Sequence, residues 1–186
     1  LCEYLRQKFL GFPTVVGYRP NILARGLATN QTSFIGLVVP DITNPFFGQI
    51  VRGVENAAFE NGYNLFLVDT NEDLEREKSA LDSLWQNDID GLILCSSRLP
   101  EEDLINQINR FPAVVLVNRE LQEILPNLTT INLNDFEGAR IATKYLVEHN
   151  RKQIWYIGGP VNSISNQRRL SGFRSVLKTS GIMNAS

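Results

Sequence analysis

Cysteine and histidine are scarce in this sequence of 186 residues, which contains two cysteines and one histidine. Cys2, Cys95 and His149 are too few and too scattered to build a zinc site or a disulfide framework. We therefore predict no metal site and no cofactor. Cys95 directly follows the apolar run Leu92–Leu94, which predicts a buried strand residue.

An excess of positive charge and a long apolar run are also absent. Eighteen Lys and Arg against twenty Asp and Glu give a formal net charge of −2. The chain as a whole is therefore not a basic nucleic-acid binder, and any DNA contact must come from a local feature. The longest apolar runs, at 34–39 and 113–117, are too short to span a bilayer. The first residues show no apolar stretch of the signal-peptide kind, so we predict a cytoplasmic location.

Sequence motifs of common enzyme classes are missing as well. The segment Val39–Asn44 after the first apolar run has no Gly-x-Gly-x-x-Gly, which argues against an oxidoreductase, and the sequence has no phosphate loop. The turn Gly158–Pro160 is weak evidence for phosphate binding, and no serine occupies a nucleophile elbow. His149 stands at the end of a helical pattern and is better explained as a cap than as a base. We therefore predict that the chain is not an enzyme.

Short apolar runs alternate with amphipathic segments from residue 34 onward. Six runs predict strands of a parallel sheet, most of them without polar alternation: 34–39, 64–69, 91–95, 113–117, 129–133 and 153–157. Five amphipathic segments predict helices: 45–61, 73–86, 101–110, 135–149 and 165–180. In the fourth helix the expected buried face is Ile141, Ala142, Tyr145 and Leu146. This alternation predicts a doubly wound α/β fold, in which ligands bind at the carboxyl ends of the strands.

Several stretches carry a family resemblance through their order and spacing. They are Gly17-Tyr18-Arg19-Pro20-Asn21, Ala24-Arg25-Gly26-Leu27, Ile35–Asp41, Asn44-Pro45-Phe46-Phe47, Asp90–Leu94, Gly138-Ala139-Arg140, Ile157–Pro160 and Arg169–Phe173. Together they resemble transcription regulators of the LacI/GalR family (lactose-repressor-like), over roughly residues 17–182. The resemblance implies a periplasmic-binding-protein-like fold of type I with two subdomains, and a small-molecule effector, usually a sugar, bound between them.

The same resemblance implies the organisation of the chain. An atypical segment at 1–16 stands where the family has its helix-turn-helix head, and 17–32 corresponds to the hinge helix and linker. Residues 33–158 correspond to the N-terminal effector-binding subdomain and 159–186 to the beginning of the C-terminal one. We therefore expect a chain truncated at both ends relative to the family.

The resemblance also implies a homodimer whose hinge contacts operator DNA, with the effector switching that contact. The hinge residues would be Asn21, Ala24, Arg25 and Leu27, with Leu27 as a minor-groove wedge. The alternative is that Leu27 belongs to the apolar face of a linker helix.

Six residues match positions that face the effector in the family: Asn44, Phe46, Phe47, Ser163, Ser165 and Arg169. Asn118 and Asp135 are further candidates for effector binding because they sit at strand ends. Adjacent aromatic rings suit a sugar face, and a guanidinium suits hydroxyls or a carboxylate. Each phenylalanine could instead be a core residue, and Arg169 a surface charge. Asn71, also at a strand end, is a weaker candidate.

Two other classes of protein stay open. A secreted or periplasmic sugar-binding protein would share the core, although the hinge segment argues against it. A dimerising fragment without ligand or DNA would associate through the helix that carries Ile50, Val51 and Val54, together with the following helix. It would act as a dominant negative or have no function.

Overall fold

The computed structural model describes residues 31–161 and 163–182. The chain divides into two units, 1–33 and 34–186, and the described helices and strands belong to the second. The proposed hinge residues Asn21, Ala24, Arg25 and Leu27 lie outside the described residues, as does the segment 1–16.

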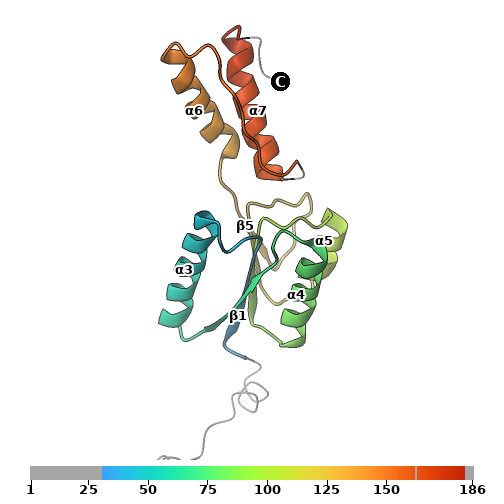
Figure 1. Cartoon of the computed structure of the whole chain (residues 1–186). Coiled ribbons are helices and arrows are strands. Elements are labelled where there is room, and N and C mark those ends of the chain that lie inside the picture. Colours follow the sequence, from blue (N-terminus) through green and yellow to red (C-terminus); the bar gives the residue numbers. More distant parts are fainter. Residues whose placement is uncertain (1–30, 162, 183–186) are drawn as a thin grey trace, which may run out of the picture. The chain divides into compact units, whose positions relative to one another are not determined.

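A five-stranded parallel sheet forms the centre of this unit (Figure 1). Its strands are β1 (Phe34–Val39), β2 (Asn64–Asp69), β3 (Gly91–Cys95), β4 (Val114–Val117) and β5 (Leu128–Ile131). Their order is β2-β1-β3-β4-β5, and every neighbouring pair is parallel. The chain changes direction across the sheet at β1, which makes the carboxyl ends of β1 and β3 a topological switch point. The predicted doubly wound fold is confirmed.

Five helices follow the strands. They are α3 (Pro45–Glu60), α4 (Leu74–Gln86), α5 (Glu101–Ile108), α6 (Asp135–Glu148) and α7 (Ile164–Thr179). Helix α3 lies on one side of the sheet and α4 and α5 on the other (Figure 1). Four of the helices begin after a residue whose side chain accepts a backbone N–H of the first turn: Asn44, Asp73, Asn134 and Ser163. These caps are local signals, which is why the predicted helix starts agree closely with the structure.

Two apolar clusters cover the two faces of the sheet. On the α3 side Leu37, Val39 and Cys95 pack with Phe47. The larger cluster on the other side unites β1, β3 and β4 with α4 and α5, and includes Val38, Leu81, Leu84, Leu92, Leu94, Leu104, Ile108 and Leu116. Cys95 is buried as predicted, and desolvation raises the pKa of its thiol to about 12.

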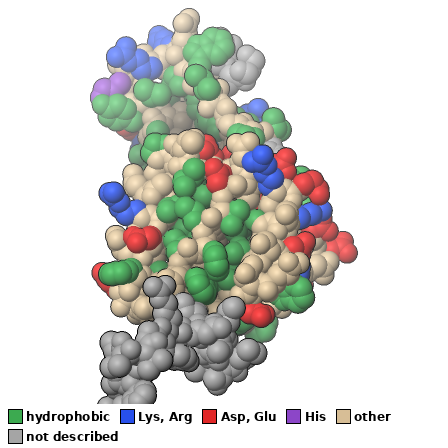
Figure 2. Space-filling model, turned by 60° about the horizontal axis from the view of Figure 1, so that its bottom comes forward, with side chains coloured by type: hydrophobic (Ala, Val, Ile, Leu, Met, Phe, Trp, Pro, Cys, Tyr) green, Lys and Arg blue, Asp and Glu red, His purple; other side chains and the backbone are tan. Residues whose placement is uncertain are grey.

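The outer strands are more exposed than predicted. Strand β2 carries the exposed Phe66 and Leu67, and β5 ends on the exposed Ile131. An edge strand has a neighbour on one side only, so its side chains lose part of their cover. Figure 2 shows hydrophobic side chains gathered in the middle of one face of the molecule, flanked on both sides by charged ones.

The predicted strand at 153–157 is wrong, because this segment is an irregular extended chain. Ile154 is buried, and the Tyr156 ring lies 5.3 Å from that of Phe173 on α7, whereas Trp155 and Ile157 are 79% and 96% exposed. A strand needs a partner for its backbone groups, and within the described residues no strand pairs with this segment. It packs on α7 instead.

Helix α6 buries a different face from the one its sequence suggested. Ile141, Ala142, Tyr145 and Leu146 are exposed, and Thr143 is the residue of that turn that is buried. The reason is that α6 packs mainly on α7, alongside it, and presents its Phe136 and Ala139 side to Gly172 (Figure 1).

Replacing Gly172 with alanine is expected to lower the free energy of unfolding by about 1–3 kcal/mol, because overpacking a tight contact costs that much. A Cβ at this position would overlap the backbone carbonyl of Phe136, which cannot move without shifting α6. Urea denaturation followed by circular dichroism measures the loss.

The control is Gly53→Ala in α3, where a Cβ meets nothing within 4 Å. This change is expected to raise stability by up to about 1 kcal/mol, since alanine favours the helix. Equal effects of the two substitutions would contradict the tight crossing of α6 and α7.

Candidate functional site

The carboxyl edge of the sheet carries a group of unusual backbone conformations. Asn71 and Glu72 after β2, Ser96 after β3 and Asn118 after β4 have positive φ angles of 51°, 56°, 50° and 56°. Such conformations are uncommon outside glycine and cluster at functional sites. Their position agrees with the edge at which open α/β sheets bind ligands.

The loop after β1 leads into α3 through Asn44. The Asn44 Oδ1 atom accepts the Phe46 N–H at 3.0 Å and thereby caps the helix. Phe46 is 38% exposed, whereas Phe47 is 8% exposed and belongs to the core. The two rings meet edge to face at 5.0 Å. Of the two predicted aromatic contacts, the structure therefore leaves Phe46 accessible and places Phe47 in the core.

A buried carboxylate on α4 holds the loop after β3. Glu77 is 3% exposed and accepts hydrogen bonds from the Ser97 hydroxyl and from the Arg98 N–H, the latter at 3.1 Å. The Arg98 guanidinium in turn pairs with Glu72 at 3.1 Å. The loops after β2 and β3 are thus joined at the switch point. Sequence reasoning missed Glu77, although its spacing of four and seven residues from the buried Leu81 and Leu84 places it on the apolar face of α4.

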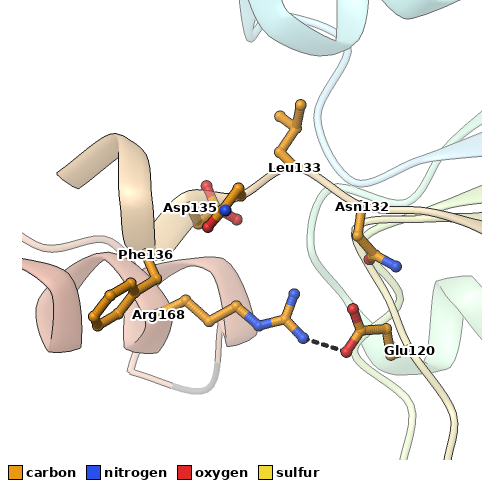
Figure 3. A pocket seen from close by; sticks show the side chains of 7 residues that line it. Glu120, Asn132, Leu133, Asp135, Phe136 and Arg168 are labelled. Atoms are coloured by element: carbon orange, nitrogen blue, oxygen red, sulfur yellow. Dashed lines mark hydrogen bonds and ion pairs between the residues drawn. The ribbon is translucent and has the colours of Figure 1, made fainter. Parts of the chain in front are cut away.

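A polar pocket of about 370 Å³ lies next to the carboxyl ends of β4 and β5 (Figure 3). Its lining is Glu120, Asn132, Leu133, Asn134, Asp135, Phe136 and Arg168. Glu120 comes from the loop after β4, the segment 132–134 links β5 to α6, and Arg168 comes from α7. Arg168 donates to Glu120 Oε2 at 2.6 Å, the contact that Figure 3 marks.

Asp135, at the start of α6, is bound by Arg169 of α7. The Arg169 Nε donates to Asp135 Oδ1 at 2.8 Å, and a terminal guanidinium nitrogen lies 2.7 Å from the same oxygen. The Asp135 side chain is 5% exposed and that of Arg169 52% exposed. The structure therefore brings these two predicted residues together, and leaves much of the guanidinium at the surface.

Two of the other predicted residues, Asn118 and Ser163, already have structural partners. Asn118 is buried, and its Oδ1 accepts the Leu133 N–H at 3.3 Å, which ties the end of β4 to the segment after β5. Ser163 caps α7 by accepting the Asn166 N–H at 3.3 Å. Ser165 is half-buried in the first turn of α7. Their contacts with an effector stay predictions.

Asn166 is a further residue that sequence reasoning missed. Its Oδ1 accepts the Tyr156 hydroxyl at 2.8 Å and the Gly159 N–H at 3.1 Å, and its Nδ2 donates to the Pro160 carbonyl at 3.3 Å. One amide thus fixes the turn at 158–160 against α7. The sequence gave no signal for it, because a polar residue in the first turn of a helix is usually solvated.

His149 caps the end of α6, as predicted. Its backbone N–H donates to the Tyr145 carbonyl, and its ring Nδ1 lies 2.8 Å from the same oxygen. In residues 31–161 and 163–182 no three His, Cys, Asp or Glu side chains are grouped so that they could hold a metal ion. None of the helices in these ranges combines the length and the apolar character that crossing a membrane requires.

Comparison with known proteins places this architecture. Residues 32–185 match the family model described as periplasmic binding proteins and sugar binding domain of LacI family. The ribose operon repressor of Escherichia coli K12 is 34% identical over 169 residues, which cover 90% of this chain and 50% of the repressor. That of Halalkalibacterium halodurans is 36% identical over 169 residues, which cover 91% of this chain and 49% of the repressor.

Solved structures agree with these matches. A periplasmic binding protein/LacI transcriptional regulator of Alkaliphilus metalliredigens, crystallised with D-xylulofuranose, is 32% identical and superimposes with a TM-score of 0.72. The superposition covers 83% of this chain and 55% of that one. The chain spans about half the length of the curated relatives it matches. With most of its residues inside the family model and its fold shared, the chain belongs to the family of periplasmic binding proteins and LacI-family sugar binding domains.

Proposed function

We propose that this chain is the effector-sensing core of a transcription regulator, a repressor whose operator binding is controlled by a sugar. The observation that carries the proposal is the polar pocket at the carboxyl edge of the sheet in a chain whose relatives are ribose operon repressors. Such a pocket offers the oxygen acceptors and N–H donors that fix the orientation of a polyhydroxylated molecule.

The effector contacts that we propose come from both sides of this edge. Phe46 supplies an accessible aromatic face, and the Asn44 side chain still has its amide N–H₂ free of the cap bond. Asp135 and Arg169 form a fixed donor–acceptor pair on the α6–α7 side, with Ser163 and Ser165 near the start of α7. Asn118 is retained as a weaker candidate, because its Oδ1 is already used.

The partners and the organisation of the protein are proposals of the same kind. Operator DNA would be contacted by the hinge at 17–32 through Asn21, Ala24, Arg25 and Leu27, and the protein would act in the cytoplasm. Homodimerisation would use α3 and the exposed edge strand β2, whose backbone is open to pairing. The packing of α6 on α7 supports a boundary between subdomains near Asn134, ahead of α6, in place of residue 158.

A genetic experiment tests the regulatory role. Deleting the gene that encodes this chain is expected to raise transcription of a sugar uptake or utilisation operon, measured by genome-wide RNA sequencing with and without added sugars. Complementation with Arg169→Ala is expected to restore repression that no sugar relieves, because the Asp135–Arg169 pair is lost.

Lys178→Ala is the matched control, since Lys178 is an exposed cation near the far end of the same helix. It is expected to behave as the unaltered gene does. If no transcript responds to the deletion, or if the protein is found outside the cytoplasm, the proposed regulator is wrong and the secreted sugar-binding protein is favoured.

A further inference from the structure

We propose that the pocket beside β4 and β5 selects uncharged polyhydroxylated ligands, and that Glu120 excludes their phosphorylated forms by occupying Arg168. This inference rests on the proposed sugar-sensing function and specifies its ligand. It assigns roles to Glu120 and Arg168, which lie 48 positions apart in the sequence and meet in the pocket (Figure 3).

The charged groups in and beside the pocket form two ion pairs. Its lining contains two carboxylates, Glu120 and Asp135, and one guanidinium, that of Arg168. Arg168 is bound to Glu120 at 2.6 Å, and Asp135 to Arg169 at 2.7 Å. Both cations are therefore matched by a carboxylate in direct contact, and the set of four groups carries no net charge.

A phosphate group in this pocket would meet the negative charge of Glu120. A sugar phosphate carries close to two negative charges at neutral pH. To bind Arg168 it would have to displace Glu120, and the released carboxylate would then face the phosphate at short range. The Asp135 carboxylate is already paired with Arg169 and adds little to this repulsion. Like charges at such a distance repel each other, and solvent weakens this repulsion because the Glu120 side chain is 54% exposed.

Two further arginines near the lining in sequence, Arg119 and Arg140, are also engaged by other groups. They are therefore not available to pair with a phosphate. Arg119 donates a terminal guanidinium N–H to the Leu99 carbonyl at 3.0 Å and is not part of the lining. Arg140 is held by Glu137 through two hydrogen bonds of 2.6 Å each. These contacts raise the pKa of Arg140 and lower that of Glu137, so both groups stay charged and neutralise each other.

The pocket offers hydrogen-bond acceptors to a neutral ligand. Its carboxylate and amide oxygens accept hydrogen bonds, and hydroxyl groups donate them without adding charge. The Asn132 Oδ1 atom is buried and has no hydrogen-bond partner in the structure, so a donor nearby would satisfy it. Phe136 adds a partly exposed aromatic ring at one side of the lining. A ligand that carries hydroxyl groups around an apolar ring face matches this combination of acceptors and aromatic surface.

The test compares matched pairs of sugars by isothermal titration calorimetry. The probes are D-ribose with D-ribose 5-phosphate, D-fructose with D-fructose 1-phosphate, and D-glucose with D-glucose 6-phosphate. For the pair that binds, the dissociation constant of the phosphate ester is expected to exceed that of the neutral sugar at least tenfold. In Glu120→Gln, which removes the negative charge that compensates Arg168, the ratio of the two constants is expected to shift about tenfold toward the ester, equivalent to about 1.4 kcal/mol.

Two further variants separate this effect from a general change of the loop. Glu123→Gln removes an equal charge from the same loop outside the pocket and is expected to leave the ratio unchanged. Adding Arg168→Ala to Glu120→Gln is expected to cancel the shift, because the uncompensated guanidinium is then absent.

The outcomes separate this inference from the proposed function. Two results would overturn the proposed exclusion of phosphate esters while sugar sensing stands. One is tighter binding of the ester by the unaltered chain, and the other is a ratio of dissociation constants that Glu120→Gln leaves unchanged. If neither member of any pair binds, the proposed sugar sensing is wrong, and the inference about Glu120 is wrong as well. Weaker binding of the ester together with the shift in Glu120→Gln supports both.

Discussion

Replacing Phe47 with alanine is expected to lower the free energy of unfolding by about 3–5 kcal/mol, the range measured for deleting a buried phenylalanine ring. The ring fills the space between α3 and the sheet, where it packs with Leu37, Val39 and Cys95. Leu37 and Val39 are fully buried in the interior strand β1, so they cannot move into the cavity without breaking the sheet. Equilibrium denaturation in urea measures the loss.

Phe46→Ala is the matched control, one residue away in the same helix. Because more of this ring is exposed, the loss of stability is expected to be less than half as large, and the main effect is expected on sugar affinity. Equal losses of stability in the two variants would contradict the assignment of Phe47, and not Phe46, to the core.

The contrast between these neighbours shows what the sequence could have revealed. Phe47, Val51, Val54 and Ala58 recur at spacings of three and four residues, and all of them face the sheet or are partly buried against it. Phe46, Ile50, Val54 and Ala57 recur at the same spacings, and Ile50 also packs against this cluster. The spacing alone therefore leaves both phenylalanines as possible core residues, and the packing of the folded chain decides between them.

Elements whose signals are local were predicted well, and those that depend on a distant partner were not. The start of α3 follows from the adjacent Asn44 and Pro45, and strands β1, β2 and β3 have the predicted bounds. The segment at 153–157 has the composition of a strand, yet pairing decides whether it becomes one. The buried face of α6 likewise depends on which helix it meets.

The candidate site divides in the same way. Arg169 was predicted from a family motif and Asp135 from its place at a strand end, and the structure adds that they bind each other. Glu120 and Arg168 were not predicted as a pair, because no property of either position indicates a partner 48 residues away. Charged residues on a loop and on a helix are by default solvated, and only the folded chain places them together.

Glu77→Ala is expected to lower the free energy of unfolding by about 2–4 kcal/mol and to weaken sugar binding. The carboxylate accepts two hydrogen bonds in a buried position, from Ser97 and from the Arg98 N–H. Removing it leaves two donors without a partner, and each buried unsatisfied group costs about 1–3 kcal/mol. The loop after β3 loses its anchor to α4, so the backbone at Ser96, with its positive φ, is no longer held in place.

Glu77→Gln separates the anchor from the charge. Glutamine keeps one acceptor oxygen at nearly the same volume, so the Arg98 N–H or the Ser97 hydroxyl retains a partner and the expected loss is about 1 kcal/mol. Denaturation in urea and calorimetry with the sugar that binds measure the two effects on the same samples. A loss below 1 kcal/mol in Glu77→Ala would contradict the anchor. Unchanged stability and sugar binding in Glu77→Gln, against a large loss in Glu77→Ala, would show that the acceptor atoms, and not the charge, hold the switch-point loops together.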